Sequence, residues 1–351
     1  AGANPAKTYV VKVVSDGGNK YRLDDFAANA VTLELSEGGT FTFDQSDSSN
    51  NGHPLRFSTT SNGTHAGGSI YTTGVVVSGT PGQAGAKTTI TVAASAPTLY
   101  YFCTVHSGMG GQANTPVTNS FTNLDGNIQS NISPNPNSKF SIVKIVKNNT
   151  SVATIGHGLG VVPKMIIGKS MTGGSYRWIV YHQAIGNTHA LYLNENFVKT
   201  DSATFWNDTS PTGSVFTIGS DNSWNGTNIF YCFGDVQGFS KFGSYIGNGN
   251  ANGTFNYTGF KPAFIMLKNT TTAASWLMYD NKRLGYNVDN NELVANTADD
   301  EETYDQIDIL SNGFKMRANG TSTNKSGDTF IYMVFASNPF TSAAGTPVTA
   351  R

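Results

Sequence analysis

A short segment near residue 100 carries a thiol, an imidazole and a thioether at regular spacing. In residues 99–110, an aromatic run leads into Cys103, then His106 three positions later, then Met109 after three more. A second imidazole, His53, lies upstream in an Asn- and Gly-rich segment. One thiolate, two imidazoles and a weak axial thioether are the ligands of a mononuclear blue-copper centre. The four residues therefore predict a site for one copper ion, and they constrain the fold of the first third of the chain.

Helical periodicity is almost absent from the chain. Residues 201–240 and 254–270 are runs of β-branched and aromatic residues interrupted by Gly, Asn and Asp, a pattern typical of strands and turns. In the first third we expect strands at residues 9–14, 31–35, 40–43, 55–58, 88–92 and 99–103. The Gly- and Thr-rich stretch 59–86 is expected to be irregular or weakly paired. The sequence predicts an all-β protein.

An internal duplication organises the rest of the chain. Seven anchor positions recur at a nearly constant offset: Pro163, Ile166, Lys169, Trp178, Tyr181, Phe216 and Tyr231 correspond to Pro262, Ile265, Lys268, Trp276, Tyr279, Phe314 and Tyr332. A constant offset over so many anchors indicates two copies of one β-unit. We expect β-sandwich repeats at residues 140–241 and 242–340, either paired around one pseudo-twofold core or standing as two small sandwiches.

The remaining boundaries follow from composition. Residues 1–115 are expected to form the first domain. Residues 116–139, rich in Pro, Asn and Ser, are expected to be a linker with one strand at 127–132. Residues 341–351 are expected to be a C-terminal tail. No signal peptide is visible.

The low charge of the chain excludes several functional classes. Charged residues make up 13% and the net charge is -1, so no basic surplus exists for nucleic-acid binding. No apolar run approaches the roughly 18 residues of a membrane span, so membrane insertion is not expected. A surface built from amides and hydroxyls suits an extracellular or virion-exposed protein. No phosphate-binding loop, catalytic carboxylate pair or Ser/His/Asp arrangement stands out, so no enzyme is predicted.

Several other residues have two interpretations. Cys232 lies in an apolar run and is expected to be a buried hydrophobic residue rather than a disulfide partner of Cys103. His65 is a candidate metal ligand, although a solvated loop histidine is favoured. The acidic run 299–302, with Asp305, is a candidate Ca²⁺ site, but it lacks EF-hand spacing and a solvated loop is favoured.

The duplicated aromatic residues also have two interpretations. Trp178, Tyr181, Trp276 and Tyr279 have the chemistry of a sugar-stacking platform. Their recurrence in both copies favours core packing instead. Ligand contacts are therefore expected on the loops that differ between the copies, at residues 186–211 and 285–304.

The first domain resembles the cupredoxin family, through residues 41–43, residues 52–53 and the Cys103, His106, Met109 spacing. That resemblance implies a Greek-key sandwich in which these three residues and His53 hold copper. It also implies that Asn51 ties the two ligand loops together. An electron-transfer protein with a type 1 copper site is the corresponding alternative for function.

The duplicated part resembles a domain of virion proteins from marine tailed bacteriophages, including predicted tail-fibre and appendage proteins. The residues that carry this resemblance are 156–167, 242–249, 257–262, 310–315 and 347–351. Residues 44–50 and 52–58 are similar to cupredoxin-like modules of the same phage proteins.

The phage resemblance implies a jelly-roll or lectin-like β-sandwich in a structural protein at the virion surface, as part of a tail fibre, spike or capsid decoration. It implies an adhesive or assembly role without catalysis. The expected partners are identical subunits (a trimer in a fibre), other virion proteins and host surface glycans. A free-standing carbohydrate-binding module is the second alternative.

Overall fold

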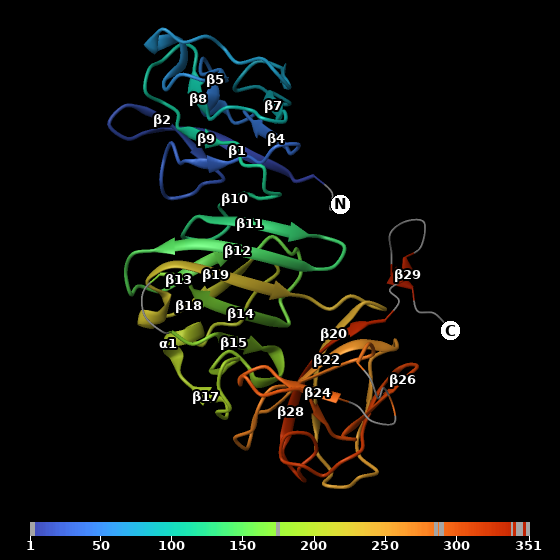
Figure 1. Cartoon of the computed structure of the whole chain (residues 1–351). Helices are drawn as coiled ribbons and strands as arrows, with labels where there is room; N and C mark the ends of the chain where they lie inside the picture. The colour runs from blue at the N-terminus through green and yellow to red at the C-terminus, as the bar shows by residue number, and fades with distance from the viewer. Residues whose placement is uncertain are drawn as a thin grey trace. The chain divides into compact units, whose positions relative to one another are not determined.

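The computed structural model describes residues 4–172, 176–283, 287 and 291–337, and the backbone of 340–341 and 347–348. The chain divides into two compact units, Ala1–Ser133 and Pro134–Arg351. In the described residues, regular structure is almost entirely β-strand (Figure 1), and the one α-helix is α1 (Ala203–Trp206). Within that part of the chain, no helix is long and apolar enough to cross a membrane. The prediction of an all-β protein is confirmed.

The first unit contains two sheets. One has the order β2-β1-β4-β7-β6, with β1 (Ala6–Ser15), β2 (Asn19–Leu23), β4 (Thr40–Asp44), β6 (Val75–Ser78) and β7 (Lys87–Thr91). The other has the order β3-β9-β8-β5, with β3 (Leu33–Glu34), β5 (Leu55–Ser58), β8 (Leu99–Cys103) and β9 (Gln112–Asn114). The pairs β1–β4 and β3–β9 are parallel and the other pairs are antiparallel. Two 3-10 turns, η1 (Ser48–Asn50) and η2 (Gly63–Ala66), flank β5.

Aromatic side chains of the first unit connect its two sheets. Phe43 on β4 lies 5.4 Å, between ring centroids, from Phe57 on β5. Tyr21 on β2 lies 6.5 Å from Tyr101 on β8. All four residues are almost fully buried. Alternate side chains of a strand point to the same face, and these four point to the face of their sheet that is covered by the other sheet. These contacts fix the position of the carboxyl end of β8, where Cys103 lies.

Some strands of the first unit lie where none was expected. β2 and β9 fall outside the predicted strands, and β6 lies in the stretch expected to be irregular or weakly paired. The stretch 116–139, expected as a linker with one strand, contains β10 (Phe121–Asn123) and β11 (Ser130–Asn135), which pair antiparallel. The ring of Phe121 also lies 6.3 Å from that of Phe41 on β4.

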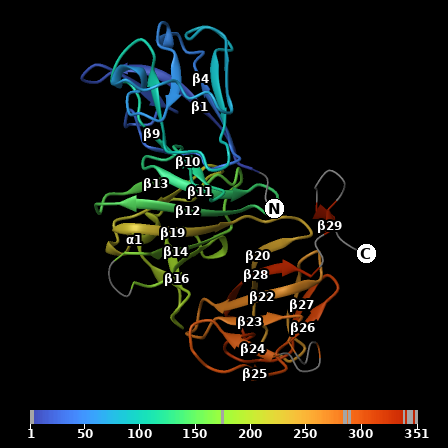
Figure 2. The same ribbon diagram turned by 45° about the horizontal axis from the view of Figure 1, so that its top comes forward.

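The second unit repeats one strand order (Figure 2). In its first half the order is β12-β19-β14-β15-β16-β17, with β12 (Phe140–Lys147), β14 (Met165–Ser170), β15 (Ile179–His182), β16 (His189–Tyr192), β17 (Thr200–Asp201) and β19 (Gly226–Phe233). In its second half the order is β20-β28-β22-β23-β24-β25, with β20 (Ser240–Ile246), β22 (Pro262–Asn269), β23 (Leu277–Asp280), β24 (Asn291–Val294), β25 (Glu302–Thr303) and β28 (Thr329–Ala336).

Each half has a second, smaller sheet. The first half pairs β13 (Ala153–Gly156) with β18 (Val215–Ile218), and the second pairs β21 (Phe255–Tyr257), β27 (Gly313–Met316) and β26 (Ile307–Leu310). The short elements are η3 (Gln183–Ile185), η4 (Asn222–Trp224), β29 (Phe340–Thr341) and β30 (Pro347–Val348). Residues 285, 286 and 288–290 of the loop expected at 285–304, most of the tail 341–351 and most of the motif 347–351 lie outside the described residues.

Two apolar clusters hold the second unit together. One lies inside the second half and includes Ile265, Tyr279 and Phe314. The other joins the large sheets of the two halves and brings Val180 together with Trp276. The indole nitrogen of Trp276 donates to the carbonyl of Tyr192 in the other half, at 2.8 Å.

The duplicated aromatic residues have the core role that their recurrence predicted. Trp276, Tyr279 and Tyr181 are buried, and the half-buried Trp178 packs against the apolar cluster between the two halves. Cys232 is buried and is not in a disulfide, as expected.

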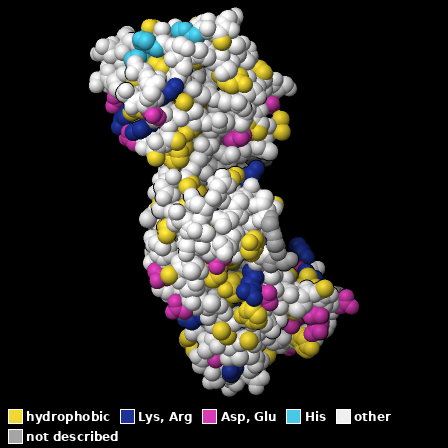
Figure 3. All heavy atoms as spheres, turned by 90° about the vertical axis from the view of Figure 1, so that its left-hand side faces the viewer, with side chains coloured by type: hydrophobic (Ala, Val, Ile, Leu, Met, Phe, Trp, Pro, Cys, Tyr) yellow, Lys and Arg dark blue, Asp and Glu magenta, His cyan; other side chains and the backbone are white. Residues whose placement is uncertain are grey.

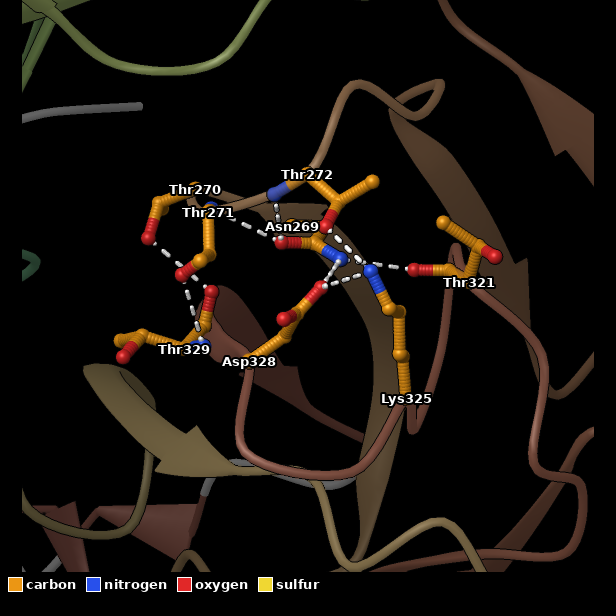
Figure 4. Close-up of polar contacts among 8 residues, drawn as sticks. All are labelled: Asn269, Thr270, Thr271, Thr272, Thr321, Lys325, Asp328 and Thr329. Atoms are coloured by element: carbon orange, nitrogen blue, oxygen red, sulfur yellow. Dashed lines mark hydrogen bonds and ion pairs between the residues drawn. The ribbon is translucent and has the colours of Figure 1, made fainter.

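Hydrogen bonds of one buried side chain, Asn269, connect two strands of the second half (Figure 4). The buried amide of Asn269 donates to the carbonyl of Thr321 and to the carboxylate of Asp328, both at 2.8 Å. Its oxygen accepts from the backbone nitrogens of Thr271 and Thr272. This side chain therefore ties the end of β22 to the start of β28.

Candidate metal centre

Three of the four predicted copper ligands lie together in the first unit. The Cys103 sulfur is 4.0 Å from Nδ1 of His53 and 3.8 Å from Nδ1 of His106. The potential ligand atoms of the three residues all lie within 4.8 Å of one another. Among the described residues, this is the one group of three or more His, Cys, Asp or Glu side chains that is placed to hold a metal ion.

The strand pairing explains why His53 and Cys103 meet. β5 and β8 are antiparallel, with Leu55 opposite Cys103, so the chain entering β5 lies beside the chain leaving β8. The backbone nitrogen of Thr104 extends this contact by donating to the carbonyl of Pro54, at 3.1 Å. His106 then returns toward the sulfur, and its backbone nitrogen donates to Cys103 Sγ at 3.4 Å.

The spacing of the three donor atoms fits a single ion. A metal about 2.3 Å from a sulfur and about 2.0–2.1 Å from a nitrogen, in a trigonal plane, places those two atoms about 3.8 Å apart. The observed sulfur–nitrogen distances of 4.0 and 3.8 Å are close to that value. The two imidazole rings lie 4.5 Å apart between centroids. The donor set therefore fits a metal that favours thiolate and imidazole.

The fourth predicted ligand, Met109, is fully buried at the end of the same loop. Its carbonyl accepts from the backbone nitrogen of Tyr21 at 2.9 Å. The following Gly110 allows the loop to return close to β8, since a Cβ at this position would lie 1.7 Å from the carbonyl oxygen of Tyr101. Any larger residue at this position would displace the loop.

Residues outside the ligand set position the ligands. The Tyr21 hydroxyl and the Gln45 amide both donate to the carbonyl of His53, each at 2.8 Å. Asn62 donates to the hydroxyl of Ser107 and accepts from the nitrogen of Gly108, again at 2.8 Å. These contacts hold both ligand segments, and the sequence alone did not single them out.

Asn51 does not occupy the position that the cupredoxin resemblance implied. It is exposed, and its backbone nitrogen donates to the carbonyl of Ser48 within the same turn. Asn62 instead connects the Cys103–Met109 loop to η2. The tie between the two ligand loops that the resemblance implied for Asn51 is therefore not observed, and Asn62 holds only the Cys103–Met109 loop.

The surroundings of His53 disfavour its protonated form. Partial burial, and then repulsion from His106, lower the pKa of His53, which keeps its imidazole neutral and able to bind a metal. Burial, with a further contribution from Cys103, raises the pKa of the nearby Tyr21. The tyrosine therefore remains a hydrogen-bond donor to the His53 carbonyl.

The four remaining histidines lie outside this group. Nε2 of His65 lies 2.9 Å from the carbonyl oxygen of Cys103, so His65 contacts the ligand loop through the backbone. His157 and His182 are buried and each accepts from a backbone nitrogen two residues further along, whereas His189 lies 4.0 Å from Asp201.

The acidic run is solvated, as favoured from the sequence. Residues 299–302 and Asp305 are exposed, and Glu301 pairs with Arg283 and Asn291. In the described part of the chain, no metal-binding group includes any of these carboxylates.

Comparison with known proteins gives one match. Residues 112–339 match the family described as Domain of unknown function (DUF7483). The curated proteins and the solved structures each gave no match. The matched segment covers well over half of the chain and includes both halves of the second unit. The chain belongs to the DUF7483 family.

Proposed function

We propose that this chain is a non-catalytic structural protein of a tailed-bacteriophage virion, and that its first unit holds one copper ion. The observation that carries the copper part is the convergence of Cys103 Sγ with Nδ1 of His53 and of His106. Thiolate and imidazole favour copper over harder ions, and Met109 is the candidate axial ligand.

The proposed role of the ion is a cross-link. His53 precedes β5, and the other ligands lie in the loop that follows β8. A metal bound to a folded site stabilises the folded state by its binding free energy. The ion would therefore fasten two segments that are 50 residues apart in sequence. His106 of the group is exposed, so the ion has a short entry path from solvent, and histidine side chains are visible at the surface of the first unit (Figure 3).

The virion role rests on the phage resemblance, and two features of the chain support it. The DUF7483 segment is a duplicated β-unit, and its histidines have structural contacts. Most of the surface in Figure 3 is neither charged nor hydrophobic, in agreement with the 13% of charged residues. Such a surface suits packing against identical subunits and contact with hydroxyl-rich host glycans.

A copper titration of the purified chain tests the metal part. One copper per chain is expected, with an intense visible band from the thiolate–copper bond, and both are lost in Cys103→Ser. Thr104→Ser, at the neighbouring half-buried position, is the matched control and should keep the band. A colourless protein that binds no copper with a reduced thiol would contradict the proposal.

Electron transfer is a second candidate function, and the exposure of His106 is the observation that favours it. His106 is exposed while Cys103 is buried, so a partner could approach the imidazole edge. This function requires reversible reduction of the bound copper, and a site that cycles in voltammetry without loss of metal would support it.

The virion part is tested on intact particles. Mass spectrometry of purified phage should detect the chain in stoichiometric amounts, and antibody labelling should place it on the particle surface. We expect the isolated chain to form a homo-oligomer in light scattering, a trimer in the case of a fibre. Absence from particles of the phage that encodes it would refute this role.

A further inference from the structure

Two aromatic side chains are exposed side by side on an edge strand of the second unit. Phe255 and Tyr257 lie on β21, the edge strand of the small sheet β21-β27-β26. Phe255 is 44% exposed and Tyr257 is 59% exposed, whereas Asn256 between them is buried. Alternate residues of a strand share one face, so both rings belong to the solvent face of β21.

Glycines support the two rings from below. A Cβ at Gly313, on the neighbouring β27, would lie 3.1 Å from the ring of Phe255. A Cβ at Gly259 would lie 3.5 Å from the Tyr257 hydroxyl. The rings therefore lie close to glycine backbone, while a large part of each side chain remains exposed to solvent.

The first half of the unit shows that the fold does not need these aromatics. Ile155 on β13 pairs with Phe216, and Asn256 on β21 pairs with the equivalent Phe314. By this register, Thr154 and Gly156 occupy the positions of Phe255 and Tyr257. The duplicated aromatics are in the core, but this exposed pair exists in one copy only. Exposed aromatics that packing does not require indicate a binding surface.

The surroundings of the pair are polar and cationic. The ammonium of Lys241 lies 5.6 Å from the centre of the Tyr257 ring. Lys315, opposite Phe255 on β27, donates to the side-chain oxygen of Asn252 at 2.5 Å. Flat aromatic faces beside ammonium and amide groups can stack on the C–H face of a pyranose ring and donate to its hydroxyl or carboxylate oxygens.

We infer that the solvent face of β21, with Phe255 and Tyr257 as the stacking platform and Lys241 and Lys315 as flanking donors, binds a polysaccharide chain. Two residues of a strand span about 6.7 Å, so the two rings are spaced to contact neighbouring sugar units. This inference deepens the adhesive part of the proposed virion role. It is independent of the copper site, which lies in the other unit.

The test is binding of the full-length chain to immobilised polysaccharides, with one neutral glucan and one uronic-acid polymer as probes. The variant Phe255→Thr with Tyr257→Thr introduces the residue that β13 carries at Thr154, and threonine suits a strand. We expect it to weaken binding at least about tenfold, because both stacking surfaces are removed; this is a loss of about 1.4 kcal/mol of binding free energy.

The matched control is Tyr304→Ala, which removes an aromatic residue of similar exposure at another surface position. It should leave polysaccharide binding unchanged. Preference for the uronic-acid polymer that falls with salt would support the role of the lysines.

Two results would overturn the inference. One is equal binding by the native chain and the double variant. The other is a double variant that dissociates from a homo-oligomer while the native chain binds neither polymer, since β21 would then be a subunit contact. Neither result bears on whether the chain is present in virions, so the two proposals can fail separately.

Discussion

The ligands of the proposed copper site depend on side chains that do not bind the metal. Asn62 holds the ligand loop through Ser107 and Gly108, and such supporting contacts commonly change metal affinity by about ten- to a hundredfold. We expect Asn62→Ala to weaken copper binding by roughly that factor while the chain remains folded. Isothermal titration measures the change.

The matched control is Asn51→Ala, because Asn51 is exposed and the cupredoxin resemblance gave it the loop-tying role. Unchanged affinity in Asn51→Ala with weakened affinity in Asn62→Ala is the expected outcome. Weakened affinity in Asn51→Ala with unchanged affinity in Asn62→Ala would mean that Asn51, as the cupredoxin resemblance implied, holds the ligand loops.

His182 makes the second unit sensitive to acid. Burial lowers its pKa to about 4 from an ordinary 6.5. Between these values the unfolded chain takes up a proton that the folded chain does not, so stability falls as pH drops from about 6.5 to about 4. The loss is about 3 kcal/mol. Urea denaturation from pH 7 to pH 4 should show a shallower loss for His182→Asn, which keeps an acceptor for Ala184.

His189→Asn is the control for that series, because His189 is only half-buried and lies near the exposed Asp201. Its pH profile should follow that of the native chain. If His182→Asn loses as much stability as the native chain over the same range, other groups cause the acid sensitivity.

The sequence correctly predicted that three of the four proposed ligand residues would meet, and Met109 as the fourth ligand stays a prediction. His53, Cys103 and His106 meet as expected, because thiol and imidazole groups are rare here and their spacing is distinctive. Tyr21 and Asn62 could not be predicted. They act across 32 and 46 residues on backbone atoms, and such contacts exist only once the sheets are formed.

At the scale of elements, strands rich in aromatic and aliphatic residues were predictable, and strands made largely of polar and charged residues were not. Residues 40–43, 55–58 and 99–103 match β4, β5 and β8 to within one residue. β2 combines Tyr21 and Leu23 with an Asn, a Lys and an Arg, and β9 has only three residues, so neither has an apolar pattern that could be recognised. β6 is an edge strand with mostly exposed valines, and its partner β7 determines its conformation.

The buried side-chain amide of Asn269 connects the end of β22 to the start of β28. Removing the Asn269 side chain leaves the nitrogens of Thr271 and Thr272 and the Asp328 carboxylate without this partner. We expect Asn269→Ala to destabilise the second unit by about 1–3 kcal/mol or more, which is the cost of unpaired buried polar groups. Urea denaturation measures the change.

Asn319→Ala, at an exposed position of the same half, is the control for Asn269→Ala. Its effect should stay within about 0.5 kcal/mol. Equal effects of the two substitutions would show that the buried network does not stabilise these strand ends.

At the scale of the whole molecule, the chain combines a unit that contains a candidate metal site with a duplicated β-unit of the DUF7483 family. The constant offset of the repeated anchors was enough to predict a duplication. It did not reveal how the halves meet, because the cluster between them uses side chains such as Met165 and Met333 that have no distinctive spacing.

We expect two unfolding transitions, because the chain divides into two compact units and each buries its own set of apolar side chains. The central claim is that the metal is a structural cross-link of the first unit, and differential scanning calorimetry of the full chain with and without copper tests it most directly. Copper at a hundred times its dissociation constant should stabilise one unfolding transition by about 2.7 kcal/mol and leave the other unchanged. Cys103→Ser should abolish that shift. An identical thermogram with and without copper, in a protein whose thiols are reduced, would contradict the account.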